Sequence, residues 1–252
     1  MGLVRKLIGG TLMYGLNAMA FALFIGINVL SHWLSKCTEK TRVRVLRVFC
    51  SLLLFGNIFR YFICYPFLLG EIHIPVEYST VAYFTVPTVL LLNRKRSRSW
   101  AAYSGLMAGF FYYLAMILLG GRIYDSYPPY DIWISMFCHG TLYLCGLVTI
   151  RTEACPSRDG YKLALGTALV CVRALILRPY VIGADGLFIY KLLDGDLIRA
   201  FLPETSWSVL LPIYYAAAIS LVLLSMGIFF RSNRREYDRF SGKQSQMAVI
   251  PA

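Results

Sequence analysis

Apolar stretches of roughly 20 residues alternate along the chain with short polar segments. An α-helix rises about 1.5 Å per residue, so about 20 apolar residues cross a hydrocarbon core about 30 Å thick. We distinguish seven such stretches: Leu12–Trp33, Val45–Leu69, Val76–Leu92, Trp100–Gly120, Ile132–Ile150, Lys162–Ile182 and Trp207–Phe230. The third is the shortest. The pattern predicts an all-α polytopic membrane protein with about seven transmembrane helices.

The basic residues are distributed unevenly between alternate loops. One set of loops, within 36–47, 94–98, 151–162 and 231–243, contains 17 of the 25 lysines and arginines. Basic loops stay in the cytoplasm, which predicts an external amino terminus and a cytoplasmic carboxyl terminus. We expect residues 1–230 to form a single membrane domain and residues 231–252 a polar, disordered cytoplasmic tail.

The composition excludes a soluble enzyme and a nucleic-acid-binding protein. The chain is 58% hydrophobic and only 15% charged, and its net charge of +12 comes from short clusters beside the membrane spans. Such clusters suit anionic lipid headgroups better than a nucleic acid. The seven cysteines show no C-x-x-C pair, and no phosphate-binding or metal motif is present. We therefore expect no cofactor and no metal.

Polar residues inside the predicted spans are the main candidates for a functional site. A charged side chain at the centre of a bilayer costs about 3 kcal/mol on insertion scales, so such residues usually have a function. The candidates are Asn57, Arg60, Glu77, Ser79, Thr80, His139, Arg173 and Arg178. Counting helical rise from the external ends places them all in the outer half of the bilayer. We predict one polar cavity between the second, third, fifth and sixth helices.

Positive charge predominates among these candidates. Arg60, Arg173 and Arg178 oppose a single acid, Glu77, which favours a ligand with phosphate or carboxylate groups. We expect the three arginines, with Asn57, to bind an anionic headgroup. The alternative is a set of structural pairs, for example Glu77 with Arg178.

The chemistry predicted for this cavity depends on His139. A neutral imidazole can act as general base for a hydroxyl nucleophile. On a regular helix Glu77 faces the same way as Thr80, whereas an extended chain after Pro75 would align Glu77 with Ser79. The nucleophile is therefore Ser79 or Thr80, with Cys138 a weaker third candidate. The alternative is a structural histidine that forms hydrogen bonds between helices.

Three short motifs resemble a known family. Asn57-Ile-Phe-Arg60, Ile74-Pro-Val-Glu-Tyr-Ser79 and Cys138-His-Gly140 are similar, in order and spacing, to motifs of the YwaF-like bacterial integral membrane proteins. That family is related to animal integral membrane acyltransferases that act on phospholipids. Its pattern has histidine where this chain has Glu77, and has cysteine, the implied acyl-carrying nucleophile, where this chain has Ser79. The resemblance spans about residues 45–230 and implies a bacterial plasma membrane location.

Two functional hypotheses follow from these residues. The first is an acyltransferase or acyl hydrolase acting on a membrane lipid, in which Ser79 or Thr80 attacks the acyl carbonyl and His139 moves the proton. The second is a non-catalytic lipid-binding or transport protein that uses the same cavity. In either case the external loop 183–204, with two short apolar runs, is predicted to lie at the interface as a lid or lateral gate, and the alternative is ordinary interfacial anchoring.

Overall fold

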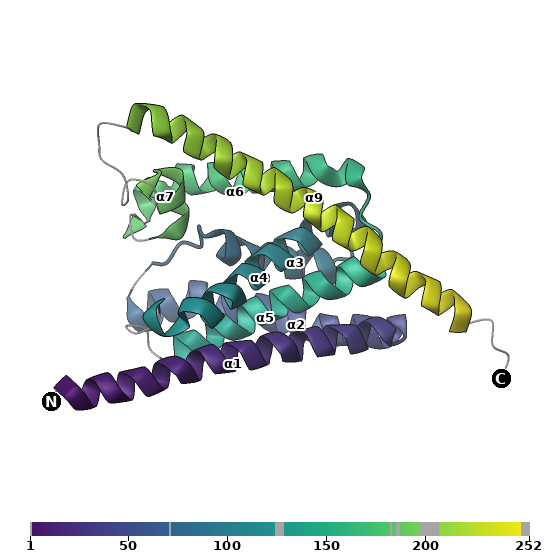
Figure 1. Ribbon diagram of the computed structural model, residues 1–252, viewed down its shortest axis with the longest axis horizontal. Coiled ribbons are helices and arrows are strands. Elements are labelled where there is room, and N and C mark those ends of the chain that lie inside the picture. Colours follow the sequence, from purple (N-terminus) through teal and green to yellow (C-terminus); the bar gives the residue numbers. More distant parts are fainter. Residues whose placement is uncertain are drawn as a thin grey trace.

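The computed structural model describes residues 2–70, 72–123, 129–181, 183–184, 187–196 and 207–247, and every regular element in these ranges is helical (Figure 1). The α-helices are α1 (Gly2–Lys36), α2 (Glu39–Phe59), α3 (Tyr78–Leu91), α4 (Arg98–Ile123), α5 (Pro129–Thr152), α6 (Gly160–Leu177), α7 (Phe188–Leu193) and α9 (Trp207–Met247). A π-helical segment, η1 (Arg60–Leu69), extends α2. Short 3₁₀ turns η2 (Lys95–Ser97), η3 (Ser157–Asp159) and η4 (Arg178–Tyr180) flank α4 and α6.

Six helices in the described part of the chain are long and apolar enough to span a membrane: Gly15–Lys36, Glu39–Phe67, Lys95–Gly120, Tyr130–Thr152, Ser157–Tyr180 and Leu210–Ser241. The prediction of an all-α polytopic membrane protein is therefore confirmed.

The third predicted span differs from the other six. Its helix, α3, has 14 residues and covers about 21 Å, which is less than the hydrocarbon thickness. The chain before it is not helical, because Pro75 restricts the residue before it and Glu77 has the extended ψ of 146°. Only Val76 and Glu77, at the start of the predicted third span, lie in the non-helical chain before α3.

Helix α5 lies at the centre of the bundle, and every residue from 138 to 150 is buried. Its closest neighbour is α4, because glycines let the two backbones approach. A Cβ atom added to Gly109 would lie 2.4 Å from the Cβ atom of Tyr143, and one added to Gly146 would lie 2.7 Å from the backbone nitrogen of Leu106. Small residues at a helix crossing are a usual way to pack helices in membranes.

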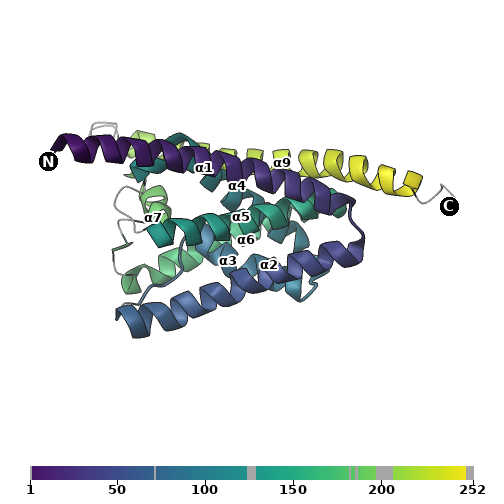
Figure 2. The ribbon, with the colours of Figure 1, turned by 90° about the horizontal axis from the view of Figure 1, so that it is seen from below.

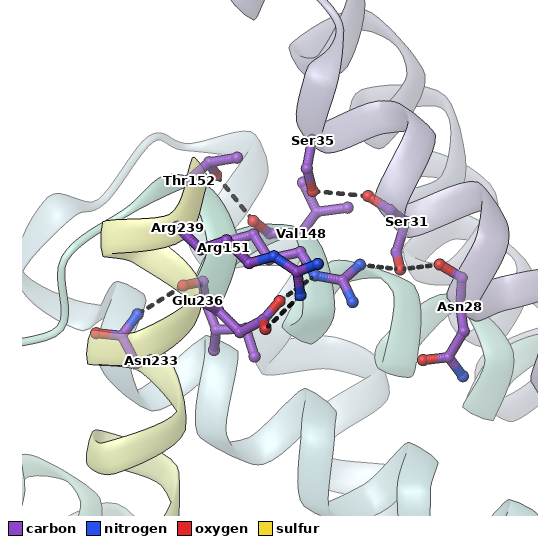
Figure 3. Close-up of polar contacts among 10 residues, drawn as sticks. Asn28, Ser31, Ser35, Val148, Arg151, Thr152, Asn233, Glu236 and Arg239 are labelled. Atoms are coloured by element: carbon purple, nitrogen blue, oxygen red, sulfur yellow. Dashed lines mark hydrogen bonds and ion pairs between the residues drawn. The ribbon is translucent and has the colours of Figure 1, made fainter. Parts of the chain in front are cut away.

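Helices α1 and α9 run along the bundle and end on the same side, where the carboxyl terminus lies (Figures 1 and 2). We call this side the inner end, because it contains the basic loops, and the opposite side the outer end. A polar network joins α1, α5 and α9 at the inner end (Figure 3). Arg151 donates to Glu236 at 2.9 Å and to the hydroxyl of Ser31 at 2.5 Å. Arg239 lies 3.9 Å from the same glutamate.

The buried side chain of Asn233 connects α9 to the end of α5. Its amide nitrogen donates to the backbone oxygens of Ile150 and Glu153 at 2.9 Å and 2.8 Å, and its oxygen accepts from the backbone nitrogen of Cys155 at 2.8 Å. The amide thereby satisfies carbonyls that the end of a helix leaves without partners. The prediction of a disordered tail from residue 231 is wrong for residues 231–241, since α9 continues through them and Asn233 and Phe240 are buried.

Candidate functional site

The predicted site residues gather around the outer ends of α2, α3, α5 and α6. Arg60 begins η1, and a wide helical turn of this kind often marks a functional position. Its guanidinium donates to the carboxylate of Asp131, in the first turn of α5, at 2.8 Å. The same guanidinium lies 5.2 Å from the ring centroid of Tyr65 and 6.0 Å from that of Tyr61. Arg60 is therefore paired within the protein, with an acid that the sequence analysis did not count.

Arg178 is paired in the same way. Two of its nitrogens donate to the two carboxylate oxygens of Asp194, each at 2.7 Å, and its guanidinium lies 5.2 Å from the ring centroid of Tyr190. Arg173, one turn earlier on α6, donates to the backbone oxygen of Pro75. The two arginines therefore attach α6 to α7 and to the segment before α3. The excess of positive charge that suggested an anionic ligand is absent once Asp131 and Asp194 are counted.

Glu77 stabilises the start of α7. The backbone nitrogen of Ile189 donates to its carboxylate, at 3.2 Å and 3.4 Å from the two oxygens. A carboxylate at a helix amino terminus is favourable, because the first N–H groups have no partner within the helix. The first apolar run of the predicted lid is thus a short helix held by Glu77 and Asp194. The second run, residues 197–202, lies outside the described residues.

His139, on α5, is enclosed by residues of α3 and α4. Only 7% of the residue is exposed, and its ring stacks on that of Tyr112 with centroids 3.7 Å apart. In the neutral tautomer with the proton on Nδ1, that nitrogen donates to the backbone oxygen of Ser135 at 2.9 Å. The hydroxyl of Tyr83 lies 2.9 Å from Nδ1 and 3.2 Å from Nε2, and in this tautomer Nε2 is the nitrogen that can accept its hydrogen bond. This arrangement agrees with the alternative in which the histidine connects helices.

The two hydroxyl candidates differ in position. Thr80 donates to the backbone oxygen of Glu77 at 2.8 Å and lines a pocket together with that residue. Ser79 is half-buried and is not among the residues that line this pocket. The helix begins at Tyr78 and Glu77 precedes it with an extended ψ of 146°, so the structure matches neither alternative in full. Thr80, and not Ser79, lines the pocket with Glu77.

Asn57 and Cys138 lie together inside the bundle. The amide nitrogen of Asn57 donates to the backbone oxygen of Leu53 at 2.8 Å and contacts the sulfur of Cys138 at 3.4 Å. Both side chains are buried between α2 and α5. In the described structure they stabilise a helix contact, and neither lines the pocket beside Glu77.

That pocket, which we call the outer pocket, has a volume of about 310 Å³. It lies between η1, the segment 72–77, the first turn of α3 and the connection from α6 to α7. Its polar lining comes from Tyr61, Tyr65, His73, Glu77 and Thr80. The predicted cavity included α5, yet no α5 residue lines the outer pocket, and His139 and the three arginines lie outside its lining.

Several residues of this region were missed by the sequence analysis. Asp131 opens the fifth span and Asp194 ends the first apolar run of the lid, so an acid next to an apolar run was the available signal. Tyr61 and Tyr65 follow Arg60 at intervals of one and five residues and gave no such signal, because tyrosine is common at membrane interfaces.

The cysteines give no sign of metal or redox chemistry in the described part of the chain. No group of three or more potential ligands among the described residues could hold a metal ion. The sulfurs of Cys50 and Cys145 lie 3.6 Å apart between α2 and α5, as buried packing residues. Outside the spans, burial raises the pKa of the Cys155 thiol to about 11, which keeps it protonated at neutral pH.

No protein-family model, curated protein or solved structure matches this chain. The resemblance to the YwaF-like proteins remains a hypothesis, based on the three short motifs alone.

Proposed function

We propose that this protein binds the polar part of a membrane lipid in the outer pocket. The supporting observation is the pocket itself, about 310 Å³ in volume, with five polar side chains at the predicted outer end of a membrane bundle. A pocket of this size is at the lower limit for small-molecule sites. It would hold a headgroup while the acyl chains remain in the bilayer.

The lining suggests a headgroup that donates hydrogen bonds. Glu77 provides carboxylate oxygens, and the hydroxyls of Tyr61, Tyr65 and Thr80 can each accept a further bond. The nearby Arg60 is already paired with Asp131. We therefore propose hydroxyl or amine groups on the ligand, in place of the anionic headgroup that the sequence suggested.

We infer that the rim of the outer pocket faces the hydrocarbon. Ile72 lines it and is 69% exposed, and Phe67 and Phe188, which are close in sequence to the lining residues Tyr65 and Leu187, are 81% and 61% exposed. Large apolar side chains of this kind at the edge of a polar pocket suit an amphiphile better than a water-soluble ligand. A lipid could thus enter sideways from the outer leaflet.

A pocket-filling variant tests this proposal. Val181 lines the outer pocket, so Val181→Trp should reduce the amount of lipid that co-purifies in a mild detergent, measured by native mass spectrometry. Val48→Trp is the matched control, because Val48 is 55% exposed on α2 and does not line the pocket. Equal lipid occupancy in the two variants and the wild type would contradict the proposal.

Acyl transfer is a second candidate function, favoured by the hydrogen bond between Tyr83 and His139. Tyr83 lies four residues after Ser79 and three after Thr80, hence on the same face of α3 as both hydroxyls. A hydroxyl could attack an ester carbonyl of the lipid and pass its proton through Tyr83 to His139. The imidazole would return that proton to the leaving alcohol, and water or a second lipid would then accept the acyl group.

The resemblance to YwaF-like proteins agrees with this chemistry and with a bacterial plasma membrane. The test compares lipid extracts of cells that overproduce the wild type, His139→Ala or Tyr83→Phe. Acyl transfer requires that the wild type change the acyl composition and that both variants lose this effect while remaining monodisperse on size-exclusion chromatography. A wild-type-like lipid profile in His139→Ala would leave binding as the better account.

A further inference from the structure

At the inner end, the connection from α5 to α6 separates two pockets. Residues Ala154, Cys155 and Pro156 line both of them. One pocket, of about 730 Å³, extends toward α9, and the other, of about 470 Å³, lies between the first turns of α4 and α6. We call the second one the inner pocket. Neither shares a residue with the outer pocket, so the inner pocket is a separate candidate site.

The lining of the inner pocket has more positive than negative charge. Five basic residues line it, Lys95, Arg96, Arg98, Arg158 and Lys162, against two acids. The two acids are already occupied, because Arg98 donates to Glu153 and Lys162 donates to Asp159 at 2.5 Å. Asp159 also accepts from the hydroxyl of Ser99 at 2.6 Å.

Three cations therefore remain for a ligand. The described structure shows no carboxylate within ion-pair distance of Lys95, Arg96 or Arg158, and all three residues are exposed. They come from two loops, before α4 and before α6, that lie about 60 positions apart in the sequence. The rule that cytoplasmic loops are basic explains why these three residues are positively charged, but it does not explain why they line the same pocket.

Two helix amino termini add positive potential to the same pocket. Arg98 and Ser99 belong to the first turn of α4, while Tyr161 and Lys162 belong to the first turn of α6, and all four line it. The 3₁₀ turns η2 and η3 precede these helices, and the backbone N–H groups of Arg98 and Gly160 already donate to the oxygens of Lys95 and Ser157. What favours an anion here is therefore the positive end of the two helix dipoles. Cationic side chains and helix ends thus act together.

The pocket also lies where α4 and α6 enter the membrane. Trp100, which follows the pocket residue Ser99, packs so closely on Gly166 that an added Cβ atom there would lie 2.5 Å from its ring. Tyr161 in the lining is followed at helical spacing by Leu165 and Leu169, and these three residues are 66%, 56% and 58% exposed. An apolar face of α6 therefore begins at the pocket. The acyl chain of a lipid whose headgroup is bound in the pocket could lie along this face.

We propose that the inner pocket binds the phosphate-bearing headgroup of an anionic lipid of the predicted cytoplasmic leaflet, with an acyl chain along α6. Three unpaired cations favour a headgroup with more than one negative charge, such as a phosphate monoester. Arg96 and Arg158 can each bind phosphate oxygens bidentately, and Lys95 adds a point charge.

The test uses the full-length protein in detergent and three ligands. These are dioctanoyl phosphatidic acid, dioctanoyl phosphatidylcholine and inorganic pyrophosphate, titrated with native mass spectrometry as the readout. The pocket variant is Lys95→Gln/Arg96→Gln/Arg158→Gln. The control variant, Lys40→Gln/Arg44→Gln/Arg47→Gln, removes the same charge from exposed positions of α2.

We expect phosphatidic acid to bind the wild type and the control with the same Kd, and to bind the pocket variant about tenfold or more weakly at low salt. An equal loss in both triple variants would mean general surface attraction and would overturn the proposal, as would no loss in either. Pyrophosphate binding as tight as that of phosphatidic acid would overturn the lipid assignment in favour of a soluble phosphate. If the pocket variant does not yield folded protein, Arg158→Gln, which removes one exposed side chain, replaces it.

Discussion

The two ends of the bundle contain the same residue types in opposite arrangements. At the outer end, Arg60 and Arg178 are paired with Asp131 and Asp194. At the inner end, three basic residues line a pocket without a carboxylate partner in the described structure. The comparison shows that the number of arginines in a segment does not identify a ligand site. What matters is whether acids from other elements have already neutralised them.

The surroundings explain the difference. The outer arginines lie within or next to membrane spans, where an unpaired charge is costly, so folding without a partner for each would be unfavourable. The inner basic residues lie in water next to the membrane, where an unpaired charge costs little and remains available to a ligand. The following predictions test this contrast, beginning with the largest expected effect.

At the inner end, the largest expected effect on stability comes from a neutral side chain, Asn233. Asn233→Ala should lower the free energy of unfolding by about 3 kcal/mol, because two backbone oxygens and one backbone nitrogen would lose their buried partner. Thermal unfolding in detergent measures this. Arg234→Gln, on an exposed residue of the same helix, is the control and should leave stability nearly unchanged.

The ion pair between Arg60 and Asp131 at the outer end should contribute less to the free energy of unfolding than Asn233 does, but by a measurable amount. Asp131→Asn should cost about 2 kcal/mol, because the partly buried Arg60 would lose its only carboxylate partner in the described part of the structure. A double-mutant cycle with Arg60→Met isolates the pair, and the double variant should recover part of the loss. Additive effects of the two substitutions would show that this contact does not stabilise the protein.

The pair between α6 and α7 should have a smaller, local effect. Arg178→Lys keeps the charge but cannot form both parallel hydrogen bonds to Asp194, which predicts a loss of about 1 kcal/mol. Hydrogen exchange of residues 188–193 should become faster, while exchange in α5 stays unchanged. Lys191→Arg serves as the control on α7, and unchanged exchange in Arg178→Lys would refute this prediction.

Removal of the unpaired charges at the inner end should have the smallest effect on stability. Lys95→Gln/Arg96→Gln should change the free energy of unfolding by less than about 0.5 kcal/mol, since both side chains are exposed and no ion pair is lost among the described contacts. Chemical denaturation in ligand-free detergent measures this. A destabilisation as large as that of Asp131→Asn would remove the contrast between the two ends.

The sequence predicted the fold from the lengths of its apolar stretches, because crossing a membrane requires about 20 helical residues whatever the tertiary contacts. It identified the third stretch as the shortest, but it did not predict the helical continuation of α9. The side chains of Asn233 and Glu236 are polar, and their bonds to α5 join residues more than 80 positions apart, which the local sequence does not reveal.

The polar residues of the spans could be identified from the sequence, and the depth of each residue follows from helical rise. The cavity that they were expected to share could not be predicted, because no α5 residue lines the outer pocket and His139 lies outside it. The partners could not be derived in this way, because Asp131 is 71 positions from Arg60 and Ile189 is 112 positions from Glu77. Likewise, nothing in the sequence indicated that Tyr83 and Tyr112 would enclose His139.

Helix α9 connects the two regions physically. Near its start, the hydroxyls of Tyr214 and Tyr215 donate to backbone oxygens of α7 at 3.0 Å and 2.6 Å, and farther along, Arg231 and Arg234 line the pocket beside the inner one. Its 41 residues measure about 60 Å, twice the hydrocarbon thickness. A change in the tilt of α9 would therefore move α7 and the connection from α5 to α6, which Asn233 contacts, at the same time.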